Sequence, residues 1–215
     1  MPPQNPQPVQ FEVSAEMPSA SPTSKTENPA AVQRIVLTGF MGAGKTTVGR
    51  LLARRLSWRF LDADAEIEAA TGTPIAQIFE ERGEPWFREF EHETIRRLLP
   101  SESLVLALGG GAIEDSRTRS LLLTGDSTRL VHLEASLETV LTRCQGTESL
   151  RPILRERLNL EDRYRRRLPL YRASHLTVAV DSLPPGAIVE TIMESIGSVQ
   201  PLSQPITRQM EELRR

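Results

Sequence analysis

The sequence has little cysteine, no long apolar run and no excess of either charge, and each shortage excludes a class of protein. The single cysteine, Cys144, has no partner within the chain, so an internal disulfide is excluded and a reducing compartment is the simplest expectation. The longest apolar stretches, such as LVLALGGGAI at 104–113, are too short and too interrupted by glycine to span a bilayer. We therefore predict a cytoplasmic protein with no membrane partner.

The charges nearly balance, with 26 Lys and Arg against 28 Asp and Glu and a formal net charge of −2. General binding to nucleic acid requires a concentrated positive field, so we predict no nucleic-acid partner. The chain of 215 residues is 39% hydrophobic and 25% charged, which is typical of one ordinary globular domain with a sizeable core.

The N-terminal segment does not resemble a targeting sequence, because residues 1–33 have neither a basic start nor an apolar core and contain acidic residues but no arginine. Seven prolines lie between residues 1 and 31, among many Ser, Gln and Asn. Such a segment buries too little apolar surface to offset the entropy of ordering. We predict a disordered extension over 1–32, a globular domain over 33–197 and a tail over 198–215.

Strand-like apolar runs alternate with helical patterns through the globular domain. Strands are predicted at 34–38, 58–62, 103–109, 128–134 and 175–180. Helices are predicted at 44–56, 64–70, 74–82, 86–99, 136–144, 155–173 and 184–196, with Gly72 and Gly83 as C-terminal stops. This alternation favours an α/β fold, in which helices cover both faces of a parallel sheet.

The stretch GFMGAGKTTVGR, residues 39–50, joins the first predicted strand to the first predicted helix and contains the P-loop pattern Gly39-x-x-x-x-Gly44-Lys45-Thr46. Glycines let successive backbone N–H groups turn toward phosphates, and the helix N-terminus adds its positive dipole end. In such a loop Lys45 reaches the β- and γ-phosphates and the Thr46 hydroxyl binds Mg²⁺. A ligand-free turn is the alternative, but a chance match in a chain of this length is roughly 1%. We predict a nucleoside-triphosphate site made by Gly42, Ala43, Gly44, Lys45, Thr46 and Thr47.

The loop alone does not separate GTPases, ATPases and small-molecule kinases. The chain has no Asn-Lys-x-Asp guanine-reading motif, and no Asp-x-x-Gly switch sequence follows the loop. Other candidates follow the predicted strands. Asp62 and Asp64, in FLDADAEIE, end the second strand, where open α/β sheets bind ligands. A carboxylate there can take a proton from a hydroxyl or support a metal through water, whereas the alternative is that Asp64 only caps the next helix.

Two further features have more than one interpretation. Gly109, Gly110 and Gly111 end a buried strand, where they either allow a ligand to approach the backbone closely or form a flexible connector. Between residues 151 and 172 arginine is dense, which fits a solvated helix face, a nucleic-acid patch or a phosphate-stabilising lid. Arg88 lies on a predicted helix, and Trp86 beside it is a candidate wall for an acceptor pocket.

Together these motifs resemble the shikimate kinase family from about residue 33 to 197. The shared signatures, in the family's order, are GFMGAGKTT, FLDADAEIE, GEPWFREFE, LALGGGA, RPIL and RRLPLYR. The resemblance implies a P-loop NTPase-type three-layer sandwich with a five-stranded parallel sheet in the order 2-3-1-4-5 and a small lid. It implies transfer of the γ-phosphoryl group of ATP to the 3-hydroxyl of shikimate, with Mg²⁺ required. We expect shikimate as the small-molecule partner and a monomeric protein.

The resemblance also implies roles for individual residues. Asp64 holds the ring hydroxyls and accepts the proton, while Asp62 supports Mg²⁺ through water beside Thr46. Arg88 and Arg167 bind the shikimate carboxylate, and Gly110, with Gly109 and Gly111, provides backbone at the ring. On the nucleotide side Arg143 stacks on adenine and the lid arginine, Arg151, reaches the transferring phosphate. Lys45, Asp64 and Arg151 are thus the expected catalytic residues.

One departure concerns the loop after the last predicted strand, VDSLPPGA, which has no Lys or Arg where some relatives carry a basic residue near adenine. Two other functions remain open from the sequence. One is a related kinase for another hydroxy acid such as gluconate. The other is a non-catalytic nucleotide-binding module that regulates a partner.

Overall fold

The structure is a computed structural model that describes residues 32–125, 127–144 and 157–196, with only the backbone described at 157 and 158. The extension predicted over 1–32, apart from residue 32, and the tail predicted over 198–215 lie outside the described residues. The same holds for Arg151 and for the start of the helix predicted over 155–173.

A single parallel sheet organises the described chain in the order β2-β3-β1-β4-β5. Its strands are β1 (Arg34–Thr38), β2 (Arg59–Asp62), β3 (Leu104–Ala107), β4 (Thr128–Glu134) and β5 (Leu176–Ala179). The strand order and the α/β class expected above are confirmed. The central strands β1 and β3 are buried nearly throughout, because helices cover both faces of the sheet.

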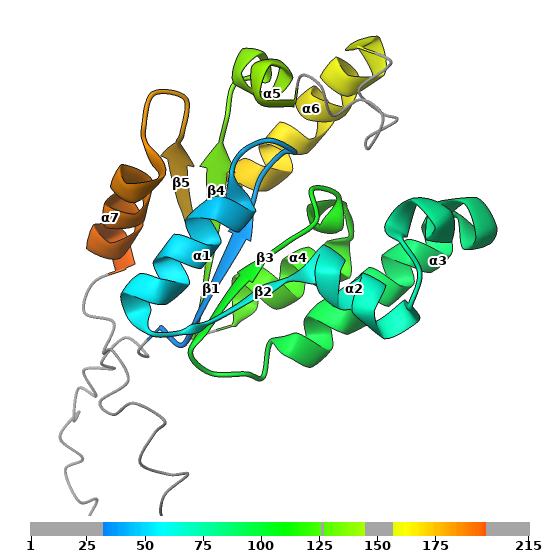
Figure 1. The fold of residues 1–215 in the computed structure, drawn as a ribbon, viewed down its shortest axis with the longest axis horizontal. Coiled ribbons are helices and arrows are strands. Elements are labelled where there is room, and N and C mark those ends of the chain that lie inside the picture. Colours follow the sequence, from blue (N-terminus) through cyan, green and yellow to red (C-terminus); the bar gives the residue numbers. More distant parts are fainter. Residues whose placement is uncertain (1–31, 126, 145–156, 197–215) are drawn as a thin grey trace, which may run out of the picture.

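Helices surround the sheet on two sides (Figure 1). They are α1 (Lys45–Leu56), α2 (Ala63–Thr71), α3 (Ile75–Leu98), the short 3-10 helix η1 (Ala112–Glu114), α4 (Ser116–Thr124), α5 (Leu137–Cys144), α6 (Arg157–Arg172) and α7 (Pro185–Ile196). On one face α1 and α7 pack together, and on the other α4 packs against β4 and α3. None of the helices in the described ranges is both long enough and apolar enough to cross a membrane.

The register of the sheet brings several strand ends to one level. Asp62 of β2 pairs with Ala107 of β3, and Ala107 pairs with Leu37 of β1. The segments that follow these strands therefore leave the sheet side by side, although Leu37 and Ala107 are far apart in the sequence. This shared edge is where ligands of open α/β sheets bind.

The structure differs from the predicted elements mainly in one strand and one helix. The strand predicted over 103–109 is confined to Leu104–Ala107, because Ser103 has a positive φ of 54° and the last hydrogen bond to β1 is the one from the Leu108 N–H to the Leu37 carbonyl. Helix α4 was not predicted. Its signal was Asp115, whose carboxylate caps it by accepting from the backbone N–H groups of Arg117 and Thr118. The helices predicted over 74–82 and 86–99 are both present within α3, joined across a kink at Gly83.

Glycine marks the helix ends that the sequence predicted. Inside α3, Gly83 has a φ of 79° and a ψ of 166°, so helical geometry is interrupted there as expected. Gly72 follows α2 with a φ of 66°, and its N–H donates to the carbonyl of Glu68. Both positions need the left-handed region that glycine adopts without steric cost.

Candidate active site

A cavity of about 820 Å³ lies at the carboxyl edge of the sheet. Its walls come from the loop after β1, the starts of α1 and α2, the middle of α3, the segment after β3, and helices α5 to α7. It gathers nearly every predicted site residue: Gly42, Ala43, Gly44, Lys45, Thr46, Thr47, Asp62, Asp64, Arg88, Gly109, Gly110, Gly111, Arg143 and Arg167. Arg151 lies outside the described residues.

The loop after β1 has the curled backbone of a P-loop. Gly39, Gly42 and Gly44 have φ values of 143°, 75° and 95°, which ordinary side chains rarely adopt. The Lys45 ammonium donates to the carbonyls of Gly39 at 2.8 Å and Phe40 at 3.1 Å, so it lies over the concave side of the loop. With α1 beginning at Lys45, backbone N–H groups and a helix N-terminus converge on one anion-binding position.

Asp62 joins the P-loop to the second strand. Its Oδ2 accepts a hydrogen bond of 2.9 Å from the Thr46 hydroxyl, and its Oδ1 accepts from the backbone N–H of Asp64 at 3.2 Å. Asp62 is therefore the N-cap of α2, and the alternative in which Asp64 is the cap is wrong. The carboxylate of Asp64 lies in the cavity instead.

The backbone after β3 closes tightly over Asp64. A Cβ on Gly109 would lie 2.5 Å from Oδ1 of Asp64, which explains why glycine stands there. Burial raises the pKa of Asp64 and the neighbouring Asp62 raises it further, while Lys45 and Arg88 lower it. A carboxylate held beside two cations, with its proton affinity raised, is suited to accept a proton from a bound hydroxyl.

Glu91 is a site residue that the sequence reasoning did not single out. It is 2% exposed, and its Oε2 accepts a hydrogen bond of 2.6 Å from Arg88. Its Oε1 lies 2.8 Å from the position a Cβ on Gly109 would take and has no hydrogen-bond partner in the described structure. Burial raises the pKa of Glu91 to about 7, although Arg88 lowers it. The signal was its position, three residues after Arg88 on one helix face.

Arg88 and Arg167 enter the cavity from α3 and α6. Arg88 pairs with Glu84 at 3.0 Å as well as with Glu91. Its guanidinium lies against Gly111, where a Cβ would collide with it. Arg167 is 3% exposed, and its Nη2 lies 2.6 Å from Oε2 of Glu114. Tyr171 connects helix α6 to the glycine segment Gly109–Gly111, because its hydroxyl donates a hydrogen bond of 2.5 Å to the carbonyl of Gly110.

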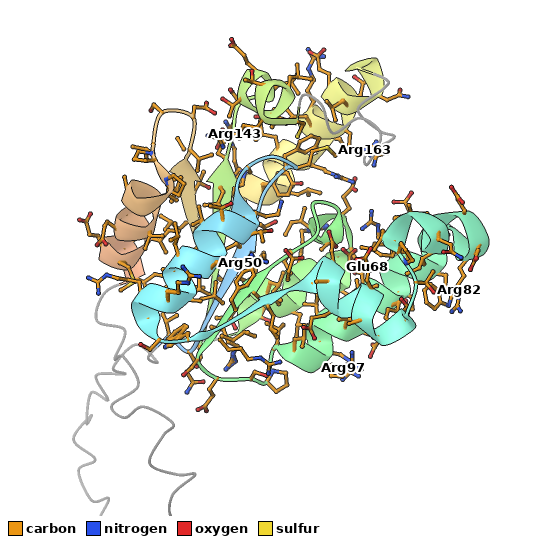
Figure 2. The ribbon with its side chains drawn as sticks, in the orientation of Figure 1. Arg50, Glu68, Arg82, Arg97, Arg143 and Arg163 are labelled. Atoms are coloured by element: carbon orange, nitrogen blue, oxygen red, sulfur yellow. The ribbon has the colours of Figure 1, made fainter. Side chains whose placement is uncertain are left out.

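Arg143 connects the P-loop to the loop after β5. It donates to the carbonyls of Gly42 at 3.4 Å and Val180 at 3.0 Å, and Figure 2 shows it beside the loop between β5 and α7. The segment VDSLPPGA, which has no Lys or Arg, contributes Leu183 and Pro185 to this end of the cavity, and Ile188 of α7 adds a third apolar side chain. An apolar wall beside one guanidinium is a suitable surface for a flat heteroaromatic base.

The aromatic wall on the acceptor side is formed by two phenylalanines, not by Trp86 as expected. Phe87 and Phe79 line the cavity and pack against each other at 4.6 Å between ring centroids. Trp86 is not among the lining residues of the described part and stacks on Phe90 at 5.1 Å. Trp86 and Phe87 point in different directions because adjacent residues on a helix are rotated by about 100° about its axis.

The described residues contain no group of three or more His, Cys, Asp and Glu side chains placed to hold a metal ion. The Thr46 hydroxyl and the Asp62 carboxylate, hydrogen-bonded to each other, nevertheless fit an oxygen-preferring cation that takes its other ligands from water and from a bound nucleotide.

The cavity thus has two parts. The donor half comprises the P-loop Gly39–Thr47, Arg143 and the loop 181–186. The acceptor half comprises Asp64, Arg88, Glu91, Gly109–Gly111 and Arg167. This fold and this site define a P-loop phosphotransferase.

Comparisons with known proteins agree with that class. The family model for shikimate kinase matches residues 41–197. The chain is 37% identical over 166 residues to a shikimate kinase of Persephonella marina, a match that covers 77% of this chain and 99% of the relative. It is 41% identical over 164 residues to a shikimate kinase of Moorella thermoacetica, covering 75% of this chain and 93% of the relative.

Solved structures give the same result. A shikimate kinase from Acinetobacter baumannii, solved in complex with shikimate, superposes with a TM-score of 0.72 at 38% identity and covers 77% of this chain and 93% of that one. The chain belongs to the shikimate kinase family.

Proposed function

We propose that this protein transfers the γ-phosphoryl group of ATP to the 3-hydroxyl of shikimate. The observation that carries the proposal is the arrangement of one continuous cavity. Its donor half presents a P-loop, and its acceptor half presents the Asp64 carboxylate and the guanidinium groups of Arg88 and Arg167 to the same space. The membership of the family supports shikimate as the acceptor.

The acceptor half explains recognition of a cyclic hydroxy acid. The guanidinium groups of Arg88 and Arg167 bind the carboxylate, because planar forks pair with carboxylates in a bidentate geometry. The Asp64 carboxylate orients the hydroxyl that reacts and accepts its proton as the bond to phosphorus forms. Gly110 presents its backbone to the ring without a side chain in between.

The donor half positions the nucleotide. The P-loop N–H groups and Lys45 hold the phosphates, and the charge that develops on the transferring group is stabilised by fixed cations rather than by covalent chemistry. The Arg143 guanidinium and the apolar loop hold the adenine. Arg151 remains the expected lid arginine, on a segment outside the described residues.

Thr46 and Asp62 are the residues that would hold Mg²⁺, Thr46 through its hydroxyl and Asp62 through water. The ion, when bound, neutralises charge on the phosphates. The 2.9 Å hydrogen bond between the two side chains holds both oxygens together at the start of α1.

We also propose a cytoplasmic monomer that binds neither membranes nor nucleic acid, with activity confined to residues 33–197. The near-neutral charge and the single cysteine support this. Deletion of residues 1–31 is then expected to leave the kinetics unchanged.

The direct test is release of ADP from ATP and Mg²⁺ by the purified protein, with shikimate, quinate or gluconate as acceptor. We expect release that depends on shikimate. Release with gluconate alone would keep the fold and the P-loop role but refute the acceptor. Measurable ATP binding without stimulation by any acid would favour a regulatory module.

A further inference from the structure

We propose that Arg163 is a third guanidinium that binds the acceptor's carboxylate and makes the site select for an anionic acceptor. This rests on the function proposed above and adds a specificity-determining residue to it. Arg163 was part of an arginine-dense stretch whose interpretation the sequence left open.

The position of Arg163 places it with the two arginines of the acceptor half. It precedes Arg167 by four residues on α6, so both side chains leave the same face of the helix. Figure 2 shows Arg163 on the side of α6 that is turned toward α3, the helix that carries Arg88. All three arginines line the main cavity.

A second cavity, of about 450 Å³, adjoins the first at these arginines. It is lined by Arg88, Arg163 and Arg167 together with Glu84, Pro85, Glu114, Asp115 and Arg166. None of its lining residues belongs to the P-loop. Arg163 therefore lies where the acceptor half opens outward, on the side away from the position of the transferring phosphate.

Arg163 differs from the neighbouring charged residues in its ion pairing. The three carboxylates of the second cavity are each committed elsewhere: Glu84 pairs with Arg88, Glu114 with Arg166 and Arg167, and Asp115 with Arg117. Arg163 makes no hydrogen bond or ion pair among the residues that the structure describes. An incoming carboxylate would pair with its guanidinium group.

The charges around Arg163 also favour binding of an anion. Burial lowers the pKa of Arg163 and the like charge of Arg167 lowers it further, while Glu84 and Glu114 oppose this from a distance. Two guanidinium groups one helical turn apart repel each other in the ligand-free protein, and an anion placed between them relieves that repulsion. The same pair of charges gives no such advantage to a neutral acceptor.

The test compares Arg163→Gln and Arg163→Lys with Arg165→Gln. Arg165 is the matched control, because it is exposed on the same helix, pairs with Glu161 and lines neither cavity. Binding of shikimate, of its methyl ester and of ATP is measured by calorimetry in full-length protein, alongside thermal unfolding. Binding at equilibrium keeps the test independent of turnover.

We expect Arg163→Gln to weaken shikimate binding about tenfold, the loss typical of one charge-assisted contact. Arg163→Lys should lose about threefold, since it keeps the charge but not the planar fork. ATP binding and the melting temperature should match those of Arg165→Gln. For the methyl ester, wild type and Arg163→Gln should bind alike.

Three results would overturn the role of Arg163. They are shikimate binding equal to that of Arg165→Gln, the same loss for the ester as for the acid, or weaker ATP binding with shikimate binding unchanged. The first result would mean that Arg163 does not contact shikimate. The second would mean that it contacts a part of shikimate other than the carboxylate, and the third that it contacts a phosphate of ATP. Failure of the wild type to release ADP with shikimate would instead refute the function itself.

Discussion

The donor half and the acceptor half of the cavity are built in different ways. Most of the donor half comes from one continuous segment, Gly39–Thr47, whose backbone conformation makes the binding surface. The acceptor half uses side chains from α2, α3 and α6 and the backbone of the glycines after β3, and these elements lie up to about a hundred residues apart in the sequence. The function of a single segment can be predicted from its sequence pattern. The function of residues scattered along the chain becomes visible only when the fold brings them together.

The two halves should fail differently when they are altered, and the largest effect is expected in the donor half. Lys45→Met removes the ammonium that lies over the P-loop and should lower kcat/KM about 10⁴-fold, while shikimate binding stays within about twofold of wild type. Steady-state kinetics and calorimetry measure both. Arg54→Ala, an exposed change on the same helix, is the control. Activity retained in Lys45→Met would mean that this loop is not the catalytic one.

Asp64→Asn tests the chemistry of the acceptor half. The change keeps the size of the side chain but removes the proton acceptor, so kcat should fall about 10³-fold with little change in the affinity for shikimate. Single-turnover kinetics separate the chemical step from product release. If the affinity falls and kcat does not, Asp64 only positions the ring.

Gly109→Ala tests whether the acceptor half depends on close approach of backbone. The added methyl group would lie 2.5 Å from Oδ1 of Asp64 and 2.8 Å from Oε1 of Glu91, so both carboxyl groups or the backbone must move. We expect kcat/KM for shikimate to drop about 10²-fold, since displacement of about 1 Å costs that much. Gly186→Ala is the control, because nothing lies within 4 Å of its added Cβ. Equal activities of the two variants would contradict the geometry.

Glu91 should make stability depend on pH. Its ordinary pKa of 4.5 is raised to about 7 in the folded protein, so the folded state holds a proton that the unfolded state releases. Its contribution to stability is complete below pH 4.5 and is lost as the pH rises toward 7. Glu91→Gln removes this loss, so relative to wild type it should gain up to about 3 kcal/mol between these pH values.

Urea unfolding of both proteins from pH 5 to pH 8 measures that difference. His132 titrates in both proteins, so its contribution cancels in the comparison. Parallel stability curves over this range would show that Glu91 is charged in the folded protein at every pH tested.

The contrast between the halves also explains what the sequence could predict. The P-loop, its strand and its helix follow from glycine spacing and apolar runs, and the sheet order followed from the resemblance; all are confirmed. Helix α4 was missed because its apolar residues are few and its main signal is one capping residue, Asp115. Glu91 was missed because its burial beside Arg88 depends on the glycine segment packed over it.

Contacts between residues far apart in the sequence could not be predicted either, because they too depend on the fold. The Glu114 carboxylate meets Arg167 across 53 positions of sequence, and no local pattern encodes that pairing. The roles of Asp64, Arg88, Arg143, Arg151 and Arg167 in turnover remain predictions.

The most direct test of separate donor and acceptor halves in one site is a paired titration of Arg88→Ala and Arg167→Ala with ATP and with shikimate. We expect both variants to bind shikimate at least about tenfold more weakly than wild type and to bind ATP normally. Equal losses for the two ligands would contradict the division of the cavity and, with it, the assignment of these arginines to the acceptor.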